Sequence, residues 1–241
     1  MKPGKIISLT MLAIVLSSCR SAQIKAPIVF NPLTLGPAGA TLKKYLDRNE
    51  GLAPRRGNLV SRVKIEASLP NLEKKGEMIA EKTVSANGHI SYEMKSFTGD
   101  NLIKTKVIGL YLSGEQEASE APTFGINAQN YRFKFKRKDS LGDRIAMIFE
   151  LTPIKKMIGL FKGELWLEEG SGNEMRQNGR LVKNPSVIFK TADFSRDFET
   201  RKGYTYLWKV DYQAETRLVG RVLLKMEFDP PQPILETIQA R

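Results

Sequence analysis

The sequence predicts a mainly β fold of the α+β class, in which antiparallel strands form one curved sheet. Two observations carry this prediction. Short segments alternate apolar and polar residues, as at residues 161–168, where Phe161, Gly163, Leu165 and Leu167 share one face of a strand. Clusters of Gly, Asn and Pro interrupt these segments about every ten residues. Such a sheet has one apolar face, which a second sheet, helices or a ligand must cover.

The N-terminal residues are typical of an export signal. Lys2 and Lys5 precede a short apolar run at residues 6–16, and the tetrapeptide LSSC ends at Cys19. The run is shorter than the roughly 20 apolar residues that span a bilayer. This arrangement resembles the lipobox of bacterial lipoproteins, and the resemblance implies cleavage before Cys19 and acylation of its sulfur and new amino group. The alternative is an ordinary signal peptide, residues 1–18, followed by a chance cysteine.

Residues 19–39 are expected to tether the lipid to the domain. Three prolines in this segment interrupt both helix and strand, although the apolar residues 28–30 offer the alternative of docking on the domain. Two acyl chains, at about 0.8 kcal/mol per buried methylene, hold a protein stably on a membrane. By analogy with the sorting rule of better-known lipoproteins, Arg20 in place of Asp favours the outer membrane. We therefore expect a lipid-anchored protein of the cell envelope that faces the periplasm.

A helix is expected at residues 40–49, because Leu42, Tyr45 and Leu46 recur at helical spacing and Thr41 can cap the start. The pair Asn87-Gly88 predicts a type I′ hairpin turn. Strands are expected at residues 59–69, 78–86, 90–97, 103–112, 131–136, 144–151, 161–168 and 222–228. The acidic segment 113–130 is expected to be a functional or mobile loop. One domain then spans residues 40–229, followed by a tail at residues 230–241.

The charge of the chain is strongly positive. The 38 Lys and Arg residues exceed the 26 Asp and Glu residues, giving a net charge of +12. Loss of Lys2 and Lys5 with the signal lowers this charge by two, and the remaining excess favours anionic membrane surfaces. Three basic clusters are candidates for such contacts and are equally explained as solvated surface: Arg55 with Arg56, residues 134–138, and Lys155 with Lys156. Export and the absence of a recognition motif argue against a nucleic-acid partner.

The sequence offers no set of catalytic residues, metal ligands or cofactor-binding residues. Its single histidine, His89, adjoins the predicted turn, and Cys19 is the only cysteine, so Ser-His-Asp, Cys-His and zinc sites cannot be assembled and no internal disulfide forms. The carboxylate pairs Glu168 with Glu169 and Asp193 with Asp197 resemble ordinary polar surface. The glycines of the 170–172 segment fit a hairpin turn rather than a phosphate-binding loop. We expect the protein not to be an enzyme.

Five segments resemble the LolA-like family of bacterial outer-membrane lipoprotein-sorting proteins. They are GLFKGELWLEE, GRLVKNPS, DFSRDFE, TRLVGRVLLKMEF and, earlier in the chain, FTGDNLIKTKVIGLYL. The resemblance implies a half-open antiparallel β-barrel wrapped around helices, with the helix at residues 40–49 on the concave side. It also implies an apolar cavity that accepts acyl chains.

The alternation of apolar residues nominates walls for this cavity, and each is equally explicable as packed core. The candidates are Phe133, Phe149, Phe161, Leu165, Leu167, Leu224 and Met226, with Tyr206 and Trp208 from an aromatic stripe that begins at Tyr204. Trp166 falls on the polar side of its strand, where it packs against a neighbouring segment or meets a membrane or partner.

Two functions follow from the sequence. The first is a carrier that binds acyl chains of lipids or lipoproteins for trafficking or sorting at the outer membrane. The second is a non-catalytic structural or sensory lipoprotein that binds another envelope protein through the same fold. The cavity distinguishes the two functions. A carrier requires a void that the acyl chain can enter, whereas a partner-binding protein requires a solid core.

Overall fold

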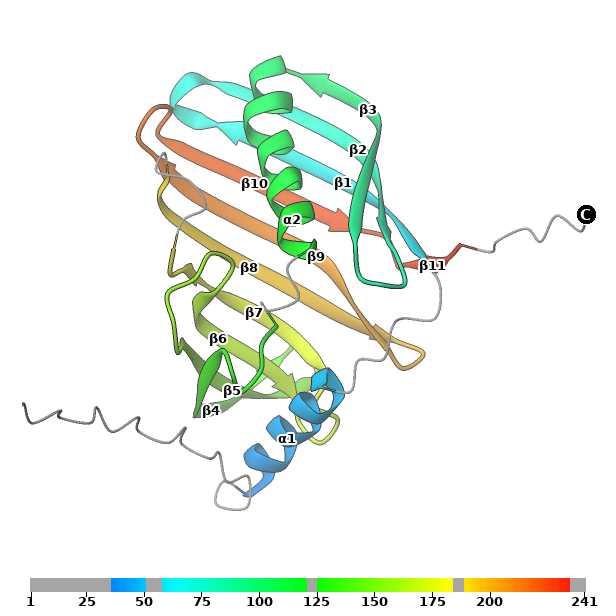
Figure 1. The fold of residues 1–241 in the computed structure, drawn as a ribbon, viewed down its shortest axis with the longest axis vertical. Helices are drawn as coiled ribbons and strands as arrows, with labels where there is room; N and C mark the ends of the chain where they lie inside the picture. Colours follow the sequence, from blue (N-terminus) through cyan, green and yellow to red (C-terminus); the bar gives the residue numbers. More distant parts are fainter. Residues whose placement is uncertain (1–35, 51–57, 121–124, 184–188, 235–241) are drawn as a thin grey trace, which may run out of the picture. The chain divides into compact units, whose positions relative to one another are not determined.

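The computed structural model describes residues 36–50, 58–120, 125–183 and 189–234 of the chain (Figure 1). These residues belong to one compact unit, Asn31–Arg241. The predicted signal peptide, Cys19, residues 20–35 of the predicted tether, the cluster of Arg55 and Arg56, and residues 235–241 of the tail lie outside the described residues.

A single antiparallel sheet dominates the fold. Ten strands follow one another in the order β3-β2-β1-β10-β9-β8-β7-β6-β5-β4, and β11 pairs with β1 beside this path. Their bounds are Leu59–Leu69 (β1), Lys74–Val84 (β2), Ile90–Gly99 (β3), Tyr131–Leu141 (β4), Arg144–Pro153 (β5), Phe161–Glu168 (β6), Glu174–Leu181 (β7), Phe189–Arg201 (β8), Tyr204–Thr216 (β9), Arg221–Phe228 (β10) and Gln232–Pro233 (β11). Within the described residues the edge strands β3 and β4 do not pair with each other, so the sheet stays open. The predicted mainly β, antiparallel fold class is confirmed.

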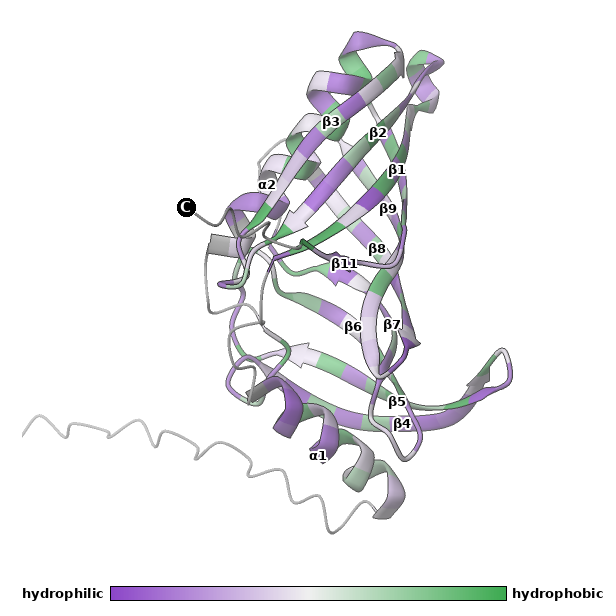
Figure 2. Ribbon diagram, turned by 90° about the vertical axis from the view of Figure 1, so that its right-hand side faces the viewer, coloured by the Kyte–Doolittle hydropathy of each residue, from purple (hydrophilic) through white to green (hydrophobic). Residues whose placement is uncertain are grey.

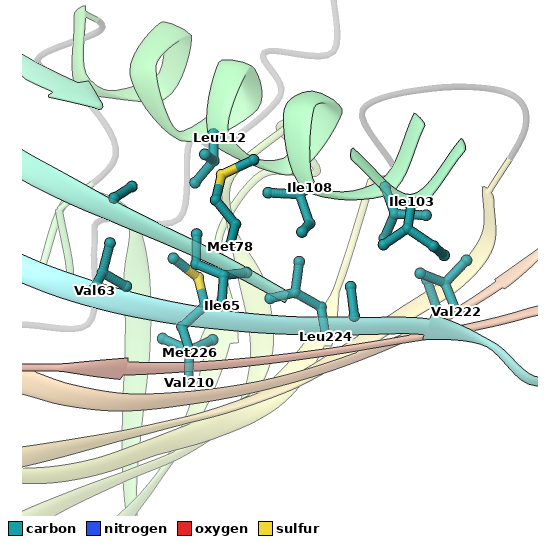
Figure 3. Close-up of a cluster of buried hydrophobic side chains, with 14 of the residues drawn as sticks. Val63, Ile65, Met78, Ile103, Ile108, Leu112, Val210, Val222, Leu224 and Met226 are labelled. Carbon is teal, nitrogen blue, oxygen red and sulfur yellow. The ribbon is translucent and has the colours of Figure 1, made fainter. Parts of the chain in front are cut away.

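Helical segments pack against one face of this sheet, here called the inner face. They are α1 (Gly36–Glu50), the π-helical turn η3 (Ile103–Ile108) and α2 (Gly109–Glu120), while the short 3₁₀ helix η2 (Pro70–Leu72) joins β1 to β2. Figure 3 shows Ile103, Ile108 and Leu112 from η3 and α2 directed at Ile65, Met78, Leu224 and Met226 of the sheet. Buried apolar contacts therefore hold η3 and α2 to β1, β2, β9 and β10.

The alternation predicted for the strands is present along β1 and β2. Residues 63, 65, 67 and 69 of β1 are buried, and the residues between them are at least partly exposed. Figure 2 shows the same alternation as successive hydrophobic and hydrophilic segments along the two strands. The helix predicted at residues 40–49 is also confirmed, although it begins four residues earlier, at Gly36.

The strand predicted at residues 103–112 is wrong, because this segment is helical. Its buried residues Ile103, Val107, Ile108 and Leu112 recur at intervals that place them on one side of a helix, and that side packs on the sheet. The loop predicted at residues 113–130 is wrong in its first part for the same reason, since α2 continues to Glu120.

The turn at Asn87-Gly88 reverses the chain between β2 and β3 as predicted, but it is not of type I′. Gly88 has a positive φ of 88°, whereas Asn87 is not among the non-glycine residues with positive φ. The Gly88 N–H donates to the Ser85 carbonyl, and the Ser85 N–H donates to the His89 carbonyl. These bonds define a three-residue loop with a single left-handed glycine, a common hairpin connection.

The opposite face of the sheet, here called the outer face, carries a second and smaller apolar cluster. Trp166 is 9% exposed and packs with Ala146, Ile148 and Met175. Two guanidinium groups lie over its ring, Arg137 at 5.5 Å and Arg176 at 5.7 Å from the ring centroid. A register shift between β6 and β7 at Trp166 adds one residue to β7 here. Trp166 therefore serves packing on the otherwise polar side of β6.

Candidate functional site

A row of inner-face residues crosses all ten main strands and defines the candidate site. Each member is the cross-strand partner of the next, so all of them share one face of the sheet. From β4 to β3 the row reads Phe135, Phe149, Leu165, Gln177, Arg196, Val210, Met226, Ile65, Met78 and Phe97. The eight members other than Gln177 and Arg196 are apolar. The two polar members, Gln177 and Arg196, lie next to each other in the middle of the sheet.

Most of the predicted cavity residues lie on this face and are packed. Phe149, Leu165, Leu167 and Met226 are 0% exposed, and Phe161 and Leu224 are 3% exposed. Phe133 is half-buried on β4. Aromatic rings connect several strands, with Phe161 lying 5.7 Å from Tyr131 and 4.9 Å from Phe194 between ring centroids. The structure thus brings these seven residues to one face, where the six buried ones form close-packed core.

The predicted aromatic stripe of β9 does not form one buried face. Tyr204 is 77% exposed and Trp208 is 38% exposed, while the Tyr206 hydroxyl donates to Glu199. The register between β8 and β9 shifts at Asp197 and Phe198, so the simple alternation breaks at this point. Leu207, which lies within the shift, packs against the buried inner-face cluster instead.

Helix α1 is held at the turn between β6 and β7. Its buried residues Leu42 and Tyr45 are 0% and 5% exposed. The turn approaches the helix so closely that a Cβ atom on Gly172 would lie 2.8 Å from the Thr41 carbonyl oxygen. The Arg48 guanidinium donates to the Ser171 carbonyl and to the Asn173 side chain. The predicted hairpin turn at residues 170–172 is confirmed, and it also positions a helix.

Under α1 the inner face carries an acidic residue. Glu174 is the cross-strand partner of Leu167 and accepts a hydrogen bond from the Gln177 amide at 2.5 Å. Burial raises the pKa of Glu174 to about 7, against the opposing effects of Gln177, Arg196 and Tyr45. This carboxyl therefore titrates near neutral pH, far above an ordinary glutamate.

Under α2 the inner face carries a buried ion pair. Lys82 on β2 is 9% exposed, and its Nζ lies 2.5 Å from Oε1 of Glu115 on α2. The Tyr92 hydroxyl donates to Oε2 of the same carboxylate, also at 2.5 Å. Burial by itself raises the pKa of Glu115, but Lys82, Tyr92 and Arg196 together hold this pKa below its usual value.

Arg196 lies between these two polar groups. Its guanidinium is 4.8 Å from the centroid of the Phe194 ring, and its charge opposes the rise that burial causes in the pKa of the Tyr111 hydroxyl of α2. Its charge favours the ionised forms of both Glu115 and Glu174. Glu174, Gln177, Arg196, Glu115, Lys82 and Tyr92 thus make up a polar seam across an otherwise apolar face.

Sequence reasoning did not nominate the polar seam. The sequence does hold a signal for Arg196. Phe194, Arg196 and Phe198 occupy alternate positions of a strand, and this spacing predicts that Arg196 shares the apolar face of β8 with the two phenylalanines. No comparable signal marked Glu115, because residues 113–130 were expected to form a loop.

Comparisons with known proteins give similarity to solved structures alone. No protein-family model and no curated protein matches the chain. A LolA superfamily protein from Nitrosomonas europaea is similar with a TM-score of 0.40 and 12% identity, over 82% of this chain and 94% of that protein. A putative outer-membrane lipoprotein-sorting protein domain from Vibrio parahaemolyticus gives 0.42 and 11%, over 84% and 95%. A DUF1329 family protein from Desulfovibrio piger gives 0.42 and 9%, over 85% and 95%. The first two descriptions name the kind of protein that the sequence resembles.

The outer face of the sheet is charged and carries two surface grooves. One, of about 770 Å³, crosses β3 to β8 and is lined by Glu66, Glu77, Asp193, Asp211, Lys75 and Lys225, among others. The other, of about 780 Å³, is lined by Lys136, Lys156, Lys162 and Arg180 with Glu150, Glu164 and Asp193. Both grooves are open and carry charged side chains, in contrast to the filled inner face.

The carboxylate pairs suggested by the sequence lie in this charged surface, together with residues of the basic cluster 134–138 and Lys156. Asp193 accepts two hydrogen bonds from Arg180, and Asp197 accepts two from Arg176. Glu168 accepts from Ser171, while Glu169 binds Lys138 at 2.8 Å. In the part of the chain that is described, no group of three or more His, Cys, Asp or Glu side chains is placed to hold a metal ion. No helix there is long and apolar enough to cross a membrane.

Proposed function

We propose that the chain is an envelope lipoprotein that binds the acyl chains of lipids or lipoproteins against the inner face of its sheet, for trafficking or sorting at the outer membrane. The observation that carries this proposal is the row of side chains, apolar except at Gln177 and Arg196, that crosses the sheet under separate helical covers. A lipid anchor at Cys19 would hold the protein at the membrane from which its ligand comes. The proposed role is binding, without a reaction.

The energetics of an acyl chain fit this role. Each methylene removed from water stabilises a complex by about 0.8 kcal/mol, so ten buried methylenes contribute roughly 8 kcal/mol before the entropy of association is subtracted. In the structure, Leu112 of α2 and Ile108 of η3 cover the apolar row that the chain would occupy. Binding therefore exchanges helical side chains for acyl methylenes, and requires α2 to move.

The test is acyl-chain binding by the full chain after purification and delipidation. Native mass spectrometry of protein taken from cells is expected to show co-purifying lipid, and a fluorescent fatty acid is expected to bind the delipidated protein. Leu165→Asn should abolish probe binding while the far-UV circular dichroism spectrum is retained. Lys162→Asn, an exposed change on the same strand, is the matched control. A delipidated parent that binds no phospholipid, lipopeptide or fatty-acid probe would remove this proposal.

The grooves of the outer face favour a second candidate function, in which the protein binds an envelope partner. The groove that crosses β3 to β8 contains more acidic than basic side chains on a chain of net charge +12, and therefore suits a basic partner surface. Charge reversal by Asp211→Lys should weaken such a complex without affecting acyl-chain binding. Cross-linking of the parent and the variant in intact cells would compare the two functions directly.

A further inference from the structure

Two cations lie on the inner face of the sheet, which is otherwise mostly apolar. Lys82 projects from β2 and is 9% exposed, and Arg196 projects from β8 in the middle of the apolar row. A charged side chain taken out of water is costly unless it is paired. A packed sheet has no need of these charges, since aliphatic residues of similar volume would hold a helix equally well. We therefore expect an anion to pair with these two cations.

The anion in this structure is a carboxylate that belongs to the covering helix. Glu115 of α2 receives Lys82 on one oxygen and Tyr92 on the other, both at 2.5 Å. Arg196 lies on the inner face of β8, and its charge acts on Glu115 and on Tyr111, one helical turn before Glu115. The lysine, the arginine and the tyrosine hydroxyl together form a receptor for a carboxylate or phosphate group.

Aromatic rings support both cations independently of Glu115. The Lys82 Nζ lies 5.2 Å from the centroid of the Phe228 ring and 5.5 Å from that of Tyr92, and Arg196 lies over Phe194. Cation–π attraction holds a cation in place without a carboxylate partner. The receptor can therefore persist when the carboxylate leaves.

Helix α2 is attached differently from the turn that precedes it. Ile103, Val107 and Ile108 fix η3 to the sheet and are at most 7% exposed. Along α2 itself, Leu112 is buried and Tyr111 packs its ring on Tyr212 of β9 at 5.4 Å between centroids, while Glu115 and Ser119 make polar contacts with the sheet. A π-helical segment beside a glycine, here Gly109, is a site at which a helix can bend. Displacement of α2 alone would expose the two cations and the part of the apolar row that Leu112 covers, while Ile103 and Ile108 remain on the sheet.

We propose that Lys82 and Arg196 form the headgroup subsite of the acyl-chain site, that this subsite takes the carboxylate or phosphate of an anionic amphiphile, and that Glu115 occupies it in the unliganded protein. The inference rests on the proposed acyl-chain binding and adds the chemical class of the ligand. A neutral or zwitterionic amphiphile would fill the apolar row but would leave the cations unpaired.

The test compares headgroups at constant chain length on the delipidated full chain. A fatty acid and lysophosphatidic acid supply the anionic groups, while lysophosphatidylcholine and a monoacylglycerol supply the zwitterionic and neutral ones. We expect the anionic ligands to bind about tenfold more tightly or better, the effect of one charge-assisted hydrogen bond. Inorganic phosphate should fail to displace them, because it lacks the chain. Displacement by phosphate alone would overturn the assignment to a lipid headgroup.

Variants separate the headgroup from the chain. Arg196→Gln should lower the affinity for anionic ligands about tenfold and leave the monoacylglycerol nearly unchanged, and Arg196→Lys should restore part of the preference. Glu115→Gln should raise the affinity for anionic ligands more than for neutral ones, because the competing carboxylate is gone. Arg176→Gln, which removes an arginine of the outer face, is the control and should leave the headgroup preference intact.

The outcomes of this test are distinct from failure of the proposed function. If none of the four ligands binds the parent, acyl-chain binding itself is wrong. If all four bind the parent with equal affinity, acyl-chain binding stands and the headgroup subsite is wrong. This comparison needs no variant, so it decides the question even if Arg196→Gln fails to fold. Equal loss of anionic and neutral ligands in a folded Arg196→Gln protein would also overturn the subsite.

Discussion

Lys82 and Glu115 join strand β2 to helix α2 through an ion pair of 2.5 Å on the inner face of the sheet. Their side chains are 11% and 22% exposed, so water screens the pair only weakly. Because α2 rests on the sheet through this contact, the pair links the stability of the helix to the charges beneath it.

Removal of one partner should destabilise the protein more than removal of both. Lys82→Met leaves Glu115 partly buried without its main cation, and is expected to lower the free energy of unfolding by about 3 kcal/mol. The double variant Lys82→Met with Glu115→Met replaces the pair by apolar side chains and should lie within about 1.5 kcal/mol of the parent. Urea denaturation of the parent, both single variants and the double variant measures the coupling. Additive effects of the two single changes would contradict a direct interaction.

Helix α1 should contribute to the stability of the domain through its buried stripe. Leu42 is 0% exposed, and Leu42→Ala is expected to cost about 2–5 kcal/mol. Lys43→Ala, at the neighbouring exposed position, should change the free energy of unfolding by less than about 0.5 kcal/mol. Chemical denaturation compares the two. Equal midpoints and slopes for Leu42→Ala and the parent would show that α1 is peripheral to folding.

The glycine pair at the centre of β6 and β7 should tolerate no side chain. Gly163 and Gly179 are direct cross-strand partners, and a Cβ on Gly163 would lie 1.9 Å from the Asn178 carbonyl oxygen. Gly163→Ala therefore forces the two backbones apart and should lower the melting temperature by several degrees. Gly114→Ala is the control, because its Cβ meets open space within α2, where alanine favours the helix by about 0.5–1 kcal/mol. A Gly163→Ala protein as stable as the parent would contradict this close approach.

The protonation of Glu174 should make stability depend on pH between about 4.3 and 7. Burial raises the pKa of Glu174 to about 7, whereas an unfolded glutamate has a pKa of about 4.3. In this window the folded state holds the proton more tightly, so the free energy of unfolding should decrease as pH rises and level off above it. The groups that face Glu174 are Tyr45, Gln177 and Arg196, and Glu174→Gln leaves all three in place.

Urea denaturation across this pH range gives the measurement. In this pH range, the free energy of unfolding of the parent should fall more steeply with rising pH than that of Glu174→Gln, in which position 174 is neutral at every pH. Parallel curves for the two proteins would mean that Glu174 titrates at its ordinary pKa.

Membrane association should depend on Cys19. The proposed acylation of this residue would hold the protein on a membrane through two acyl chains, so Cys19→Ala should shift it to the soluble fraction of the envelope. Fractionation of cells and immunoblotting measure the shift. A variant that sediments with membranes as completely as the parent would refute the lipid anchor.

Local patterns predicted the strands well because the period of a strand belongs to consecutive residues. The alternation at residues 161–168 matched β6 residue for residue, and the helical spacing of Leu42, Tyr45 and Leu46 matched α1. The same reasoning failed at residues 103–112, where apolar residues fit both periods over a short stretch and contact with the sheet selected the helix. It failed again at Trp208, because a register shift between two strands is a property of their pairing and not of either sequence.

The sequence by itself determined a mainly β domain with one apolar sheet face and a helix before the first strand, because these features depend on neighbours within a few residues. Tertiary structure alone decided that this face is filled by side chains from η3 and α2, and that Lys82, Glu115 and Arg196 meet beneath α2. These three residues lie far apart in the chain, and their charges act through space once strand register and helix packing have brought them together. The polar seam of the inner face is therefore a product of the fold.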